Sequence, residues 1–70
     1  MSKLFSSRQI VVILLREGFV FVSQRGSHAK YRKTSDVVAT VIVPTDKKEI
    51  PIGTLHSIIR QSRLADKKFK

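Results

Sequence analysis

The strongest constraint on the fold is a series of three strand-like segments in the middle of the chain. They span 19–23, 28–33 and 37–43, and they are rich in β-branched and aromatic residues or alternate with a period of two. Short turns around Gly26 and at 34–36 separate them, and Pro44 ends the third segment. Three consecutive strands joined in this way predict an antiparallel meander.

A helix is predicted before these strands. Ser6 and Gln9 have the spacing of a capping box at its start. One helical face holds Ile10, Ile13, Leu14 and Glu17, with Val11 and Leu15 beside it, and Gly18 provides a stop. The β-branched run 10–13 favours a strand instead. The cap, the length and the glycine stop decide for a helix.

A second helix is predicted after a polar loop at 45–52. Thr54 is expected to be its N-cap, and a short turn at 64–70 is expected to return Phe69 to the core. The buried stripe of this helix should hold Leu55, Ile58, Ile59 and Ser62. The predicted order is α-β-β-β-α, an α+β fold whose three-stranded antiparallel sheet carries both helices on one face. We expect one domain over residues 1–70.

The charge of the chain points to an anionic partner. There are 14 lysines and arginines against 5 acidic residues, which gives a net charge of +9 and a pI near 10.8. Nucleic acid, an acidic protein and a membrane surface all fit this excess. The longest apolar run, 10–15, is far shorter than the roughly 20 residues that span a bilayer. We therefore expect a soluble, cytoplasmic protein, and the absence of cysteine fits a reducing compartment.

The stretch 25–33, RGSHAKYRK, holds the residues best suited to chemistry. Strand alternation puts His28, Lys30 and Arg32 on one face and sends Tyr31 to the other, where it should pack in the core. A lone histidine on a strand is more often an idle solvated residue than a working one. Here, however, a Gly-Ser turn precedes it and two cations project to its side.

The turn and the two cations are the surroundings that a site for phosphate chemistry at His28 would need. Histidine titrates near neutral pH and can act as acid or base. Cations such as Lys30 and Arg32 can hold a phosphate and stabilise the charge of a pentacovalent phosphorane. Proton transfer and phosphate binding together form a minimal RNA-cleaving site, with the 2′-hydroxyl of the substrate as nucleophile.

The remaining polar residues give weaker signals. His56 could pair with His28 as acid and base, although Arg60 and Arg63 beside it indicate a solvated basic stripe. Basic runs occur at Lys47 and Lys48 and in the tail 67–70. Such runs are usually solvated surface, but they could add salt-sensitive contacts to RNA phosphates. Five scattered carboxylates and two histidines show no ligand spacing for a metal. We expect no metal and no cofactor.

Several segments together resemble the HicA toxins, small mRNA interferases of bacterial toxin–antitoxin pairs. EGFVFVSQRGSHAKY, at 17–31, is similar to the family's stretch of a glycine-aromatic turn, a strand and Gly-Ser-His with an aromatic residue three positions on. VPTDKKEIPIGTLHSIIRQSRL, at 43–64, resembles its Val-Pro segment, its Lys-Glu-hydrophobic loop and the opening of its second helix. LADKKF, at 64–69, resembles the closing segment.

The resemblance implies a fold like the double-stranded RNA-binding domain and cleavage of mRNA, with His28 as the catalytic residue. It also implies a HicB antitoxin that binds the toxin and blocks its site, the free toxin being a monomer and the complex a hetero-oligomer. The chain departs from the family pattern at three places. Ala29 stands where a second histidine or a polar residue is frequent in the family. Thr45-Asp46 stand where a histidine is common, and Arg63 stands where a glycine is frequent.

The leading hypothesis is a metal-independent endoribonuclease toxin. His28 would move the proton, and Lys30 and Arg32 would hold the phosphate. Backbone N–H groups near Gly26 and Ser27 would help to hold it, and Lys47 and Lys48 would add RNA contacts.

Two rival hypotheses remain. The same charge and fold order also fit a small RNA-binding module without turnover. A membrane-active cationic peptide ranks below both, because the first predicted helix carries only Arg8 and Arg16 as cations and its apolar face belongs to the core.

Overall fold

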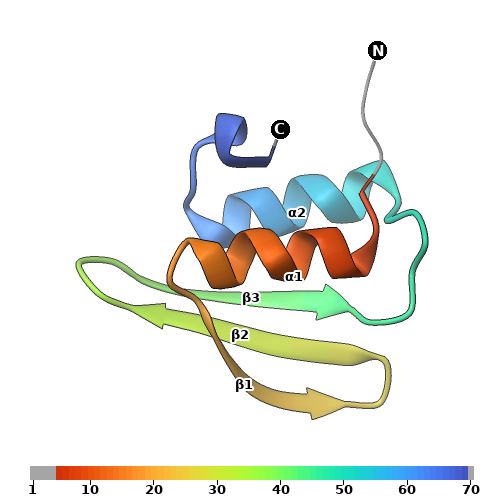
Figure 1. The fold of residues 1–70 in the computed structure, drawn as a ribbon, viewed down its shortest axis with the longest axis horizontal. Helices are drawn as coiled ribbons and strands as arrows, with labels where there is room; N and C mark the ends of the chain where they lie inside the picture. Colours follow the sequence, from red (N-terminus) through yellow and green to blue (C-terminus); the bar gives the residue numbers. More distant parts are fainter. Residues whose placement is uncertain (1–4, 70) are drawn as a thin grey trace.

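A computed structural model describes residues 5–69 and confirms the predicted order of elements (Figure 1). The elements are α1 (Ser7–Arg16), β1 (Val20–Arg25), β2 (His28–Thr34), β3 (Val38–Pro44), α2 (Ile52–Ser62) and a short 3-10 helix, η1 (Asp66–Phe69). The three strands form one antiparallel sheet in the order β1-β2-β3. The predicted α+β class and the meander are therefore both confirmed.

Both helices lie on the same side of the sheet, as predicted (Figure 1). They lie over β3, while β1 forms the far edge of the sheet, away from them. The side chains of β3 show the result, because Ala39, Val41 and Val43 are buried while the residues between them are not. All six residues of β1 are exposed.

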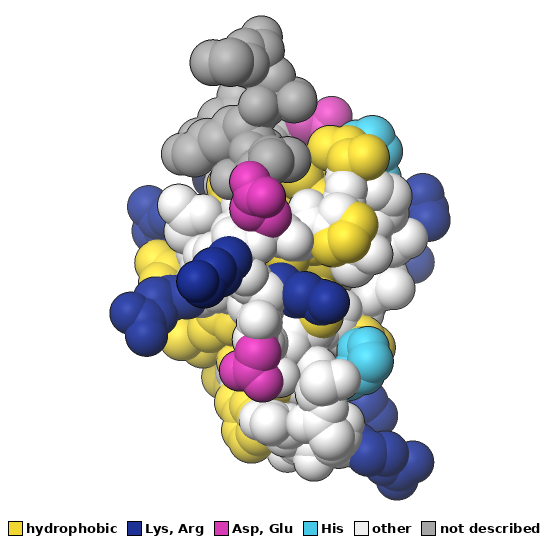
Figure 2. All heavy atoms as spheres, turned by 90° about the vertical axis from the view of Figure 1, so that its right-hand side faces the viewer, with side chains coloured by type: hydrophobic (Ala, Val, Ile, Leu, Met, Phe, Trp, Pro, Cys, Tyr) yellow, Lys and Arg dark blue, Asp and Glu magenta, His cyan; other side chains and the backbone are white. Residues whose placement is uncertain are grey.

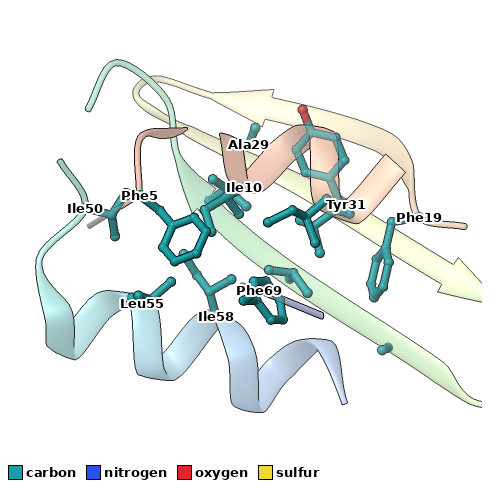
Figure 3. Packing of buried hydrophobic residues seen from close by; sticks show 14 residues of the cluster. Phe5, Ile10, Phe19, Ala29, Tyr31, Ile50, Leu55, Ile58 and Phe69 are labelled. Atoms are coloured by element: carbon teal, nitrogen blue, oxygen red, sulfur yellow. The ribbon is translucent and has the colours of Figure 1, made fainter. Parts of the chain in front are cut away.

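The core lies between the helices and the covered face of β2 and β3 (Figure 3). Its members come from every element except β1 and from the segments around them: Phe5, Ile10, Ile13, Leu14, Phe19, Ala29, Tyr31, Ala39, Val41, Val43, Ile50, Leu55, Ile58 and Phe69. The predictions that Tyr31 packs inward and that Phe69 folds back are confirmed. Apolar burial on this scale is the main stabilising contribution in so short a chain.

The helix that opens the fold begins as its sequence predicts. The Gln9 N–H donates to Ser6 Oγ at 3.1 Å, and the Ser6 N–H donates to Gln9 Oε1 at 2.8 Å. This reciprocal pair satisfies two backbone donors that the first turn would otherwise leave unpaired. It lets a helix form despite the β-branched residues that follow.

The predicted start of the second helix is wrong. Thr54 is not the N-cap, because α2 begins at Ile52 with Pro51 as the cap residue and no side-chain cap. The Leu55 N–H donates to the Pro51 carbonyl at 2.9 Å, which closes the first helical turn three residues earlier than predicted and leaves Thr54 inside it. The buried stripe is correct, with Leu55 and Ile58 in the core.

The strand boundaries shift by one or two residues. Phe19 belongs to the core ahead of β1 rather than to the strand, and β1 continues to Arg25. The turn that follows is consequently shorter than predicted, since it comprises Gly26 and Ser27 alone. The shorter turn brings Arg25 into the ladder directly opposite His28.

Candidate active site

A two-residue turn at Gly26 and Ser27 places Arg25 directly opposite His28. Gly26 has a φ of 56°, which glycine adopts without the steric penalty that a side chain brings. A glycine at the first position of such a turn matches the twist of the two strands. The ladder starts with the pair Arg25 and His28, so the turn fixes how the two side chains lie relative to each other.

His28 shares the open face of the sheet with three cations. Lys30 and Arg32 follow it on β2 at spacings of two residues, and Arg25 joins them from β1. Side chains two residues apart on a strand lie about 7 Å from each other. Arg32 Nε donates to Thr40 Oγ1 at 3.3 Å, which holds the guanidinium over β3. The structure therefore places the predicted residues His28, Lys30 and Arg32 on one surface.

No acidic side chain offsets these cations within the sheet. The three strands contain neither aspartate nor glutamate. Across residues 5–69, the ion pair present joins Lys68 Nζ and Glu17 Oε1 at 3.7 Å, and both residues lie outside the three strands. A surface with unpaired cations and no carboxylate attracts a polyanion such as the phosphate backbone of RNA.

His28 is exposed, and its imidazole makes no hydrogen bond to any residue that the structure describes. Its backbone is nevertheless well placed, because it pairs with Arg25 on one side and with Pro44 on the other. The Thr45 N–H donates to the Ser27 carbonyl at 2.8 Å and ties the turn to the end of β3. The backbone thus holds His28 in place, while its imidazole is accessible to a ligand.

Lys47 and Lys48 lie outside this surface, in the loop after β3. The loop is held against the start of α1, because the Lys47 N–H donates to Ser7 Oγ at 3.0 Å and Ser7 Oγ donates to the Pro44 carbonyl at 2.6 Å. Both lysines are exposed. The structure therefore does not bring them together with His28 on the open face.

The two histidines lie on different layers of the molecule. His56 is exposed on α2, which covers the opposite side of the sheet from the face that bears His28. Figure 2 shows the two histidine side chains as separate cyan groups. This arrangement argues against His56 as the acid–base partner of His28.

Two further observations bear on the kind of site. Within residues 5–69, no three or more side chains of histidine, aspartate or glutamate cluster as metal ligands would. In the same range, no helix has the length and apolar character needed to cross a membrane.

Arg25 is the site residue that the sequence analysis missed. The prediction of a four-residue turn at 24–27 placed Arg25 in the turn, away from the ladder. The signal was present, because a glycine followed by serine is a typical two-residue hairpin turn, and such a turn makes the residues on either side of it partners. The open face also holds the exposed apolar residues Val20, Val38 and Ile42 beside its polar side chains.

Comparison with known families gives one match. A search of curated proteins found no significant similarity. A family model described as the HicA toxin of bacterial toxin–antitoxin systems matches residues 7–64. That range begins with α1 and extends just beyond α2, so it includes the sheet, both helices and the Gly-Ser-His turn. The resemblance seen in the sequence is confirmed, and the chain belongs to the HicA toxin family of bacterial toxin–antitoxin systems.

Proposed function

We propose that this toxin is a metal-independent endoribonuclease that cleaves mRNA on the open face of its sheet. The observation that supports this most directly is His28, exposed at the Gly-Ser turn and surrounded by Arg25, Lys30 and Arg32 with no carboxylate in the sheet. A general acid or base beside unpaired cations is what RNA cleavage by internal transfer requires. The proposal places the protein in the cytoplasm, where mRNA is its substrate.

The reaction uses a nucleophile that RNA itself supplies. The 2′-hydroxyl oxygen attacks the adjacent phosphorus, and the bond from phosphorus to the 5′-oxygen of the next nucleotide breaks. Neutral His28 accepts the 2′-hydroxyl proton, and the leaving 5′-oxygen takes a proton from water or from Lys30. The products are a 2′,3′-cyclic phosphate and a 5′-hydroxyl end, and no metal ion enters the balance.

The cations stabilise the charge that develops on the phosphorane. Lys30 and Arg25 flank His28 from its own strand and from the neighbouring strand, and Arg32 continues the row. Backbone N–H groups near Gly26 and Ser27 add donors at the turn. Removing one such donor from a site of this type typically costs about a hundredfold in rate. Lys47 and Lys48, in the loop beside α1, extend the contacts to RNA phosphates on either side of the cleaved bond.

A HicB-like antitoxin completes the proposed system. It binds the toxin monomer in a hetero-oligomer and keeps RNA from the open face. An acidic partner fits the net charge of +9, because opposite charges accelerate association, whereas the like charges of two toxin copies oppose self-association.

A second candidate function is RNA binding without turnover. One observation favours it: His28 has no hydrogen-bond partner among residues 5–69 to orient its imidazole. General bases in nucleases are usually held by such a partner. A binding module would keep RNA on the cationic face and leave it intact.

The deciding experiment measures new RNA ends. We expect His28→Ala to lower the cleavage rate of a fluorescent RNA by about a hundredfold or more. His56→Ala, the matched control on α2, should keep the wild-type rate. Cleavage by the wild type should survive EDTA, and one 2′-deoxynucleotide at the cleaved position should block it. Equal cleavage by His28→Ala and the wild type would remove His28 from catalysis, and salt-sensitive binding without new ends would establish the binding module.

A further inference from the structure

A largely apolar groove runs between α1 and the β1–β2 hairpin, on the side of the sheet opposite His28. We call it the α1–β1 groove. Val11 and Val12 of α1 form one wall, and Gln24 of β1 with Ala29 and Tyr31 of β2 form the other. In Figure 2, a large hydrophobic area lies on the left side of the view and both histidines lie on the right.

Large apolar side chains around the groove remain uncovered. Val12 is 52% exposed, Leu15 is 50% exposed and Phe21 is 53% exposed. Leu15 stands one helical turn after Val11 on the same side of α1. Phe21 packs edge-on against Tyr31 with ring centroids 5.7 Å apart, so it continues the groove onto β1. A contiguous apolar surface of this kind marks an interaction site.

The edge strand beside the groove is open as well. β1 pairs with β2 on one side, and no described residue pairs with its other side. The opposite edge of the sheet, formed by β3, is partly covered by α2, because the Ile42 N–H donates to Gln61 Oε1 at 3.1 Å. An exposed apolar edge strand is a template for another strand.

Charge identifies the kind of chain that fits there. Arg8 and Asp46 both line the groove, and Arg16 lies exposed at the end of α1. A second copy of this chain would bring another net charge of +9 to the same place, which disfavours a homodimer. RNA supplies the negative charge but no strand and few apolar side chains. A protein strand with apolar and acidic residues satisfies all of these features.

We propose that the α1–β1 groove and the free edge of β1 dock a β-strand of an acidic partner protein, which we take to be the antitoxin. The strand extends the sheet beyond β1, places its apolar side chains against Val12, Leu15 and Phe21, and directs carboxylates toward the arginines. The strand is thereby anchored at the edge of β1, and the rest of the partner extends around that edge over the open face, where it keeps RNA from His28. The identity of the occupant rests on the proposed function, whereas the docking site does not depend on RNA cleavage.

One backbone group allows a sharp test. Arg25 and His28 flank the two-residue turn, so the alternation of an antiparallel ladder directs the Gln24 N–H away from β2 and toward an added strand. Gln24→Pro removes this donor and keeps the β1–β2 pairing. Gln24→Ala is the matched control, because it removes the same side chain and keeps the N–H. The pair therefore separates strand addition from side-chain contact.

The probe is the protein encoded by the reading frame beside that of the chain, purified and titrated calorimetrically into the toxin carrying His28→Ala. We expect Gln24→Pro to weaken binding about tenfold or more, and Gln24→Ala less than about threefold. The double variant Val12→Asp, Leu15→Asp should weaken binding similarly. Val38→Asp is its control, since Val38 is exposed on the open face. Circular dichroism and urea unfolding verify that each variant is folded.

Three outcomes would overturn the proposal. Unchanged binding by both Gln24→Pro and the double variant would do so. So would loss of binding only on charge reversal at Lys30 and Arg32, because the partner would then be held by the open face alone. A toxin dimer in sedimentation that Gln24→Pro dissociates would assign the edge to a second copy. An absence of RNA cleavage by the wild type would refute the nuclease and leave these binding results unaffected.

Discussion

The two outer strands of the same small sheet are built in opposite ways. β3 lies under both helices, alternates buried and exposed residues, and has its edge N–H at Ile42 bonded to Gln61. β1 has six exposed residues and a β-bulge between Phe21 and Ser23, and its outer edge has no partner among the described residues. The difference teaches that the residues that stabilise the fold and the exposed residues are separated within one sheet. The half around β3 holds the fold, and the β1–β2 hairpin carries the exposed surfaces to which we assign the binding of RNA and of a partner.

Two phenylalanines on either side of the start of β1 provide the largest test of this division. Phe19 is 2% exposed and Phe21 is 53% exposed. We expect Phe19→Ala to cost about 3–5 kcal/mol of unfolding free energy. That would remove much of the roughly 4–10 kcal/mol available to a chain of this length. Phe21→Ala should cost about 1 kcal/mol or less. Urea unfolding followed by circular dichroism measures both, and equal losses would break the comparison.

A matched pair of arginines tests whether RNA binding and cleavage are confined to the β1–β2 hairpin. Arg25 faces the same side as His28, whereas Arg60 is exposed on α2, where it donates to Ser57 Oγ at 3.3 Å. We expect Arg25→Gln to lower kcat/KM for RNA about tenfold and to reduce the salt dependence of binding by about one ion. Arg60→Gln should change either quantity less than twofold. A larger effect at Arg60 would move the RNA surface to α2.

Two glycines compare the backbone requirements of the β1–β2 hairpin with those of the packed half around β3. Gly26 needs its φ of 56°, whereas Gly53 lies in the first turn of α2 with open space where a Cβ would be. We expect Gly26→Ala to cost about 1 kcal/mol and to slow cleavage by disturbing the turn. Gly53→Ala should gain about 0.5–1 kcal/mol without affecting cleavage. Unfolding curves and initial rates provide both readouts, and a neutral Gly26→Ala would contradict the role of the turn.

The smallest expected effect concerns a strained position in the packed half. Arg63 ends α2 in the left-handed conformation with a φ of 60°, where glycine is favoured. We expect Arg63→Gly to stabilise the fold by about 0.5 kcal/mol through relief of this backbone cost. Arg63→Ala removes the same charge without that relief, so it should not stabilise. If alanine stabilised as much as glycine, charge repulsion rather than backbone strain would be responsible.

The packed half was largely predictable from the sequence, because its signals are local. The capping pair Ser6 and Gln9 and the helical spacing of apolar residues determine α1. The start of α2 was not predictable by the same rule, because Pro51 begins the helix through its carbonyl and needs no side-chain cap. A threonine before an apolar run is therefore an ambiguous signal.

The hairpin was predictable only in part. Alternation along one strand was enough to group His28, Lys30 and Arg32. The contribution of Arg25 depends on pairing between strands, and an error of one residue in the length of a turn changes which side chains are partners. The exposure of Val12, Leu15 and Phe21 was likewise invisible, because it depends on which strand the helices cover. No local pattern encodes that choice.

The attachment of α1 to the end of β3 also determines when the protein folds during its synthesis. Ser7 bonds to Pro44 and Lys47 across sequence separations of 37 and 40 residues, and the β1–β2 hairpin is synthesised before either partner exists. A lone hairpin is marginally stable, and α1 can bury its apolar face only after β3 has left the ribosome. The toxin therefore reaches its folded form late in translation, when most of the chain has already been made.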